Sequence, residues 1–178
     1  QQQGDPSAAL LLLAQAYEQN PSNAQLAERL EFALRDADKW DELDAHLRSR
    51  VNSMEPSDER MSVAMRRASL VAQHFQEPRL GYELMESERE TWEGDAEALL
   101  FTARLASDAG QSERAEALFE EASRSDDPEV RGRAQLAHAR ALVRRGESDQ
   151  ALALIDFLLE DDATRYEGHQ CAADIHAE

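Results

Sequence analysis

RLASDAGQSERAEALFEEASRSDD (residues 104–127) and RALVRRGESDQALALIDFLLEDDA (residues 140–163) follow the same pattern, 36 residues apart. Each has an Arg-led helical stretch, a glycine with a polar turn, and a second helical stretch in which an alanine precedes a large apolar residue by four positions. Residues four apart share one face of a helix. The repetition therefore predicts consecutive units, each made of two helices joined by a short turn.

The same spacing of a small and a large residue extends along most of the chain. In the second helix of each pair, the early positions are separated by 34, 38, 34 and 36 residues, and a larger side chain usually follows four residues later. The early positions are Ala9, Leu43, Gly81, Ala115 and Ala151, the later ones are Leu13, Leu47, Met85, Phe119 and Ile155, and the first helices contribute Ala103 and Ala139. Small residues let helices approach closely, and large ones fill the adjacent groove. We call this pattern the small–large seam and expect each pair to bury it against its neighbour.

Prolines, glycines and capping residues divide the chain into helices. The five prolines precede apolar-periodic stretches, where a first helical turn tolerates them, and Ser22 with Gln25 forms a capping-box pattern. No stretch alternates with period 2, so no sheet is expected. The expected helices are 6–19, 23–36, 40–53, 58–75, 78–92, 95–109, 112–124, 128–145 and 148–160, with a tenth segment over 164–177. Short connections make neighbouring helices antiparallel.

Composition excludes several classes of partner. The 178 residues carry a net charge of −18, the wrong sign for non-specific binding to nucleic acid or an anionic membrane. The longest uncharged run, which ends before Glu18, is too short to cross a bilayer. The single cysteine, Cys171, excludes an internal disulfide. We expect no nucleic-acid partner and no membrane insertion. The acidity itself is equally consistent with a salty habitat or a GC-rich genome.

The length suits one domain or a short repeat array, and we expect a single helical-repeat domain over residues 1–178. The chain opens QQQGDP without a methionine, which favours a piece of a longer protein or the loss of a leader. A cytoplasmic location is favoured, and removal of a leader would instead indicate the periplasm.

The sequence resembles the tetratricopeptide repeat family in its helix–turn–helix units near 34 residues, its small-residue register and its turns at Gly110 and Gly146. AYEQNPSN (16–23) is similar to the family's repeat ending, with Pro21 in place. The resemblance covers nearly the whole chain as about four helix pairs, with partial units at both ends. It implies an all-α fold, a right-handed superhelix of antiparallel helix pairs, with a concave surface lined by the first helices. A plain helical bundle is the alternative.

No pattern indicates a reaction or a cofactor. The glycines are never closer than 13 residues apart, which disfavours a phosphate-binding loop. In HQCAADIH, Cys171 points away from both His169 and His176 on a helix, so this stretch predicts ordinary helix residues rather than a metal face. The acidic stretch 86–97 is expected to be solvated, with weak divalent-cation binding as a minor alternative. We expect no enzyme, no cofactor and no metal.

Arginine supplies the candidate site. The acidic chain holds 18 arginines and one lysine, Lys39. On the family's geometry many of these arginines fall on the groove-facing side of the first helices, where they are joined by an apolar anchor. The candidate partner-binding residues are Arg29, Arg35, Arg66, Arg67, Arg104, Arg133, Arg140, Arg144 and Phe101, with Phe32, Leu100, Leu136 and Val143 as further large residues of that surface. The alternative is that these arginines pair with acids of neighbouring helices.

We therefore expect a non-enzymatic protein-interaction module whose groove binds an extended, acidic or carboxylate-ended peptide. In tetratricopeptide domains that hold a peptide's terminal carboxylate, basic groove residues make the contact; this sequence lacks their Lys and Asn pattern, so only the principle carries over. Arg suits the task because its planar fork makes paired hydrogen bonds to carboxylates. The alternative function is a structural spacer or a self-association segment that forms a homo-oligomer.

Overall fold

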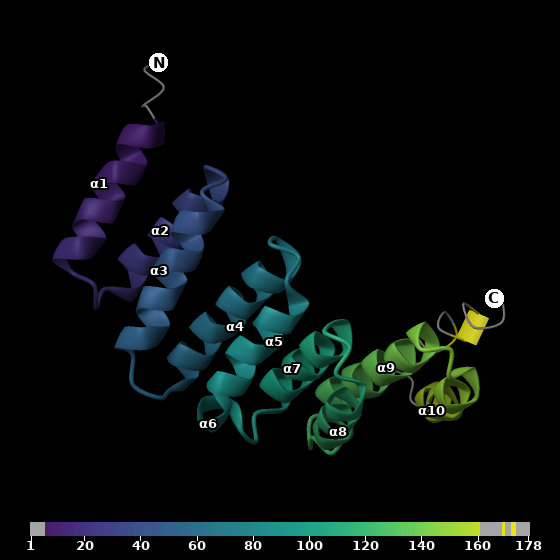
Figure 1. Ribbon diagram of the computed structural model, residues 1–178. Helices are drawn as coiled ribbons and strands as arrows, with labels where there is room; N and C mark the ends of the chain where they lie inside the picture. The colour runs from purple at the N-terminus through teal and green to yellow at the C-terminus, as the bar shows by residue number, and fades with distance from the viewer. Residues whose placement is uncertain (1–5, 161–168, 170–171, 174–178) are drawn as a thin grey trace. The chain divides into compact units, whose positions relative to one another are not determined.

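The computed structural model describes residues 6–160, 169 and 172–173, and almost all of them are helical (Figure 1). No strand occurs in this part of the chain, which confirms the all-α expectation. The ten helices are α1 Pro6–Gln19, α2 Ala24–Asp36, α3 Trp40–Ser53, α4 Asp58–Gln73, α5 Pro78–Ser87, α6 Arg89–Trp92, α7 Ala96–Asp108, α8 Ser112–Ala122, α9 Pro128–Arg144 and α10 Ser148–Glu160. The expected segment 164–177 lies almost wholly outside the described residues.

The helices match the expected ranges to within two residues, with two local differences. The cap of α2 is Asn23 rather than Ser22, because the Asn23 side chain accepts a hydrogen bond from the Leu26 N–H at 3.1 Å. The expected helix 78–92 breaks at Glu88 into α5 and the short α6. Trp92 anchors α6 by donating its indole N–H to the Met85 carbonyl at 2.7 Å.

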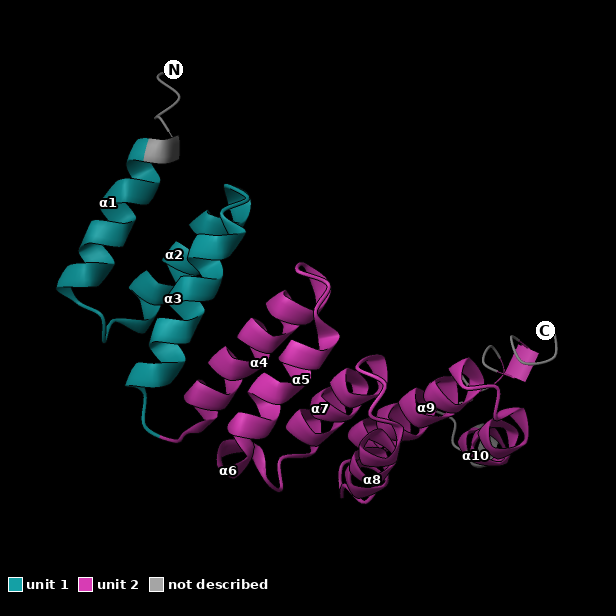
Figure 2. Cartoon of the chain, in the orientation of Figure 1, with its two compact units in different colours: residues 1–55 teal, residues 56–178 magenta. Residues whose placement is uncertain are grey.

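The chain forms two compact units, which Figure 2 colours separately. Unit 1 (Gln1–Glu55) holds α1, α2 and α3, and α2 packs against both of its neighbours. Unit 2 (Pro56–Glu178) holds α4 to α10, in which α4 packs against α5, α7 against α8 and α9 against α10. The first helices of these pairs also contact one another, α4 with α7 and α7 with α9. The expectation of one domain over 1–178 stays a prediction.

One turn geometry recurs between the two helices of every pair. Each of these turns contains a residue with φ between +54° and +79°, five positions before the early position of the seam. These residues are Asp38, Gln76, Gly110 and Gly146. At Gly110 and Gly146 the following N–H reaches back to the first helix, Gln111 to the Ala106 carbonyl at 2.8 Å and Glu147 to the Leu142 carbonyl at 3.0 Å. This bond terminates the first helix, and three residues separate it from the second.

The small–large seam is buried in four of its five occurrences. Ala115 and Ala151 are 3% and 0% exposed, and the larger residues four positions later are equally enclosed. In α5, a Cβ on Gly81 would lie 2.9 Å from the Ala68 carbonyl oxygen and 3.0 Å from the Ala72 Cβ, so α5 touches the backbone of α4. The expectation for Ala9 is wrong, since that residue is exposed. Its helix, α1, packs mainly against α2.

Replacing Gly81 by alanine tests the close contact between α4 and α5. Alanine favours a helix by about 1 kcal/mol over glycine. Forcing its methyl group against the Ala68 carbonyl costs about 1–3 kcal/mol. We expect Gly81→Ala to lower the melting temperature measured by circular dichroism, whereas Leu80→Ala, at an exposed neighbouring position, should change it little. A stabilised Gly81→Ala variant would contradict the packing.

His138 of α9 makes the packing of α8 against α9 sensitive to pH. Its ring stacks on Phe119 at 5.3 Å, and burial lowers its pKa below the usual value, with Glu116 and Glu120 opposing that shift. Because its pKa is lower in the folded state, the stability that neutral His138 contributes is fully present above the unfolded-state pKa of about 6.5. That contribution is lost as the pH falls through the folded-state pKa. From pH 7.5 to pH 5.5 the urea midpoint should therefore fall further for the wild type than for His138→Phe. A pH-independent difference between the two midpoints would refute this assignment.

Candidate protein-binding surface

Charged residues of α7 and α9 form three rungs across their shared exposed face. In each rung the two residues are 36 positions apart, which is the repeat length at this point of the chain. The outer rungs join Glu97 to Arg133 and Asp108 to Arg144, and the central rung is the equivalent pair of positions Arg104 and Arg140. Since α7 and α9 pack side by side, equivalent positions of successive pairs become neighbours. We call these six residues the α7–α9 surface.

The two outer rungs are ion pairs. The Arg133 guanidinium donates to the Glu97 carboxylate. The Arg144 guanidinium donates to the Asp108 carboxylate at 3.3 Å and to the Ser107 hydroxyl at 3.0 Å. For these two arginines the sequence alternative, pairing with acids of a neighbouring helix, is confirmed. Exposed pairs of this kind contribute about 0–1 kcal/mol each and mainly hold the side chains in place.

The central rung places like charges together. Arg104 and Arg140 are both exposed, and neither forms a hydrogen bond or ion pair with the residues that the structure describes. Partial burial of the guanidinium lowers the pKa of Arg104, and the charges of Arg133 and Arg140 lower it further, against the opposing effect of Glu97 and Asp108. The centre of this surface thus holds two positive charges that have no ion-pair partner among the described residues.

The other candidate residues lie in different surroundings. Phe101 is half-buried on α7, one turn before Arg104, and Val143 is half-buried on α9. Leu100 and Leu136 are 1% and 4% exposed, so they belong to the core and not to the surface. The sequence did not distinguish these buried leucines from the more exposed Phe101 and Val143. The difference depends on which face of each helix packs against its neighbours.

The remaining candidate arginines lie on other helices, α2 and α4. Arg66 and Arg67 are half-buried on α4, and the Arg66 guanidinium lies 3.5 Å from the Ser62 hydroxyl. Arg29 and Arg35 are exposed on α2, which belongs to unit 1. The nine candidates therefore divide between the two units, and Arg104, Arg133, Arg140 and Arg144 are the ones that the structure brings together.

Sequence reasoning missed a buried charge cluster in unit 1. Glu31 and Arg50, 4% and 5% exposed, form an ion pair of 2.5 Å between α2 and α3, and His46 Nε2 lies 3.9 Å from the same carboxylate. The two partners of the ion pair are 19 residues apart, so no helical spacing indicated them. Tyr17 packs edge-on against His46 at 4.8 Å, and burial raises the pKa of its hydroxyl.

Neither metal-binding nor membrane-spanning features occur in the described residues. No group of three or more His, Cys, Asp or Glu side chains in that part of the chain is placed to hold a metal ion. His169 is exposed, whereas Cys171 and His176 lie outside the described residues. None of the helices described has both the length and the apolarity that crossing a membrane requires.

The fold and this surface define an all-α protein built of consecutive helix pairs. No model of a known protein family matches the chain, and no curated protein matches it.

The α7–α9 surface allows a test of whether Arg104 serves stability. Replacing Arg104 by methionine keeps the apolar stem and removes one of the mutually repelling charges. We expect Arg104→Met to match or exceed the wild type in its urea unfolding midpoint. Arg144→Met, which loses the ion pair to Asp108, should instead lose up to about 1 kcal/mol. A clear destabilisation by Arg104→Met would mean that this guanidinium is a structural group.

Proposed function

We propose that this protein is a tetratricopeptide-like interaction module and that its α7–α9 surface binds a carboxylate-bearing segment of another protein. Arg104 and Arg140 are the groups that hold the carboxylate. Arg133 and Arg144 flank them and are held in place by their own ion pairs. The proposal assigns no catalytic role to any residue. It includes a right-handed superhelix, in which the first helices α4, α7 and α9 line the concave side.

The repeated geometry supports the fold part of this proposal. Helix pairs recur with one turn conformation and one buried seam, and first helices pack against first helices in unit 2. A stack of such pairs, each rotated slightly from the last, forms a curved array. The inner side of such an array is wide and shallow, which suits an extended peptide better than a small substrate.

The unpaired central rung is the observation that carries the binding part. A chain with 37 acidic residues has ample partners for 19 basic ones, yet Arg104 and Arg140 form no ion pair among the described residues. Holding two cations side by side costs stability, and such a cost is typical of functional sites. A carboxylate placed between two guanidinium groups would receive charge-assisted hydrogen bonds from both.

The net charge narrows the class of partner. With a net charge of −18, the chain as a whole repels a long polyacidic segment, and only the local field of the arginines attracts it. A segment with its negative charge confined to a chain terminus or to one or two side chains suits this arrangement best. Phe101, half-buried one turn from Arg104, would contact an apolar side chain next to that charge.

Charge reversal tests the proposal. Partners captured from a lysate by the wild-type chain are identified by mass spectrometry, and the affinity of the purified partner is then measured by calorimetry. Arg104→Glu combined with Arg140→Glu should weaken that affinity by at least about tenfold, because each carboxylate introduced repels the ligand that the guanidinium held. Amidation of the partner's terminal carboxylate should weaken binding to the wild type and leave the double variant unaffected.

A matched control separates the local site from the overall charge. Arg79→Glu with Arg124→Glu changes the net charge by the same amount at two side chains that are each 76% exposed, away from the α7–α9 surface. This control should bind the partner within about twofold of the wild type, since exposed charges far from a ligand are screened. Equal losses in both double variants would show that net charge alone governs binding and would refute the site.

A further inference from the structure

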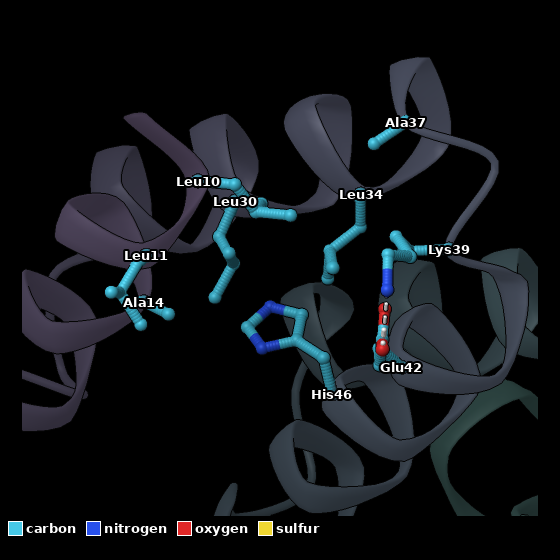
Figure 3. Close-up of a pocket in the computed structure, with 9 residues that line it drawn as sticks. All are labelled: Leu10, Leu11, Ala14, Leu30, Leu34, Ala37, Lys39, Glu42 and His46. Carbon is cyan, nitrogen blue, oxygen red and sulfur yellow. Dashed lines mark hydrogen bonds and ion pairs between the residues drawn. The ribbon is translucent and has the colours of Figure 1, made fainter. Parts of the chain in front are cut away.

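Unit 1 contains a partly open cavity of about 580 Å³ lined by residues of its three helices (Figure 3). Leu10 and Leu11 of α1 form one wall, Leu30 and Leu34 of α2 form another, and His46 of α3 projects between them. The volume lies within the range of roughly 300–1,000 Å³ that is typical of small-molecule pockets. Its walls are mainly leucine and alanine side chains.

One wall of this cavity is exposed to solvent. Leu11 is 60% exposed although it lines the cavity, an unusual position for a leucine in a small domain. The opposite wall is part of the packed core, because Leu30 and Leu34 are only 5% and 6% exposed. A ligand that entered beside Leu11 would therefore cover apolar surface that the chain itself leaves in water.

His46 supplies a polar group inside the apolar walls. The residue is 8% exposed, and its position is determined on two sides by the Tyr17 ring, 4.8 Å away, and by the Glu31 carboxylate, 3.9 Å from Nε2. Glu31 is in turn held by Arg50 at 2.5 Å. An imidazole both donates and accepts hydrogen bonds, so it can bind a hydroxyl or an amide.

The charges around the cavity are balanced. Lys39 and Glu42, at its rim, form an ion pair of 3.0 Å, and the buried Glu31 carboxylate is paired with Arg50. Neither pair leaves a net charge to attract a charged ligand, and an ion entering the apolar walls would lose its hydration without a matching partner.

We propose that this cavity binds an uncharged amphiphilic small molecule, with a hydrocarbon body between the leucines of α1 and α2 and one hydroxyl or amide at His46. The site lies wholly within unit 1 and does not depend on the function proposed for the α7–α9 surface. It would let the chain bind a small ligand as well as a protein partner.

The test titrates the ¹⁵N-labelled 178-residue chain with 1-octanol and follows the amide signals by NMR. Saturable shifts should centre on residues of the cavity wall in α1, α2 and α3. Sodium octanoate, which has the same chain length and a carboxylate, should bind at least about fivefold more weakly, because its charge must be desolvated. Equal or tighter binding of octanoate would overturn the assignment of an uncharged ligand.

Two neighbouring leucines provide matched variants. Leu11 lines the cavity and Leu12 does not, although their exposures, 60% and 66%, are similar and both lie in α1. Leu11→Asp should weaken octanol binding by at least about tenfold by placing a charge in the apolar wall, and Leu12→Asp should leave it within about twofold. Circular dichroism confirms that both variants fold.

Three results would overturn the proposal. Octanol shifts spread over the whole chain would indicate adsorption to exposed apolar residues, and equal losses in the two aspartate variants would indicate the same. A chain that dimerises in sedimentation experiments, and becomes monomeric only with Leu11→Asp, would show that a second copy occupies the cavity.

Discussion

The close approach of paired helices is the constraint on which the rest of the structure depends. Gly81 lies so near α4 that even a methyl group would meet the Ala68 carbonyl oxygen at 2.9 Å, and Ala115 and Ala151 occupy the equivalent buried positions in later pairs. Apolar packing favours such contact only when the side chains at the crossing point are small. The larger residue four positions later then fills the space beside the crossing.

Two closely packed helices also need a short connection between them. The left-handed residue in each turn lies five positions before the early position of the seam, so the turn and the seam are a constant distance apart along the chain. A turn of three or four residues brings the second helix back against the first at a defined register. Turn and seam therefore act together, and a change in the length of either would shift every contact between the two helices.

The constant register is what brings equivalent residues of successive pairs together on α7 and α9. Where their side chains are of opposite sign, as at Glu97 and Arg133, an ion pair forms between the repeats. Where the repeat carries the same residue twice, as at Arg104 and Arg140, like charges lie near enough to repel each other. Repetition of a charged residue thus concentrates charge without any local cluster in the sequence, and this is the physical basis of the proposed binding surface.

Much of the local structure could be predicted from the sequence. Helix boundaries followed from prolines, capping residues and apolar periodicity, because these act within a few residues of where they stand. The turns at Gly110 and Gly146 were visible because glycine tolerates a positive φ, whereas Asp38 and Gln76 adopt the same conformation without that signal. The break at Glu88 was likewise not apparent from periodicity.

By itself, then, the sequence determined the all-α class, the order of the helices and the position of the small–large seam from α3 onward. Tertiary structure alone decided which arginines form ion pairs, since Arg133 and Arg144 pair with acids on α7 while Arg104 and Arg140 have no such partner among the described residues. It also decided the burial of the Glu31–Arg50 pair. The reason is that helical propensity and apolar periodicity are local properties, whereas the partner of a charge depends on which faces of distant helices come into contact.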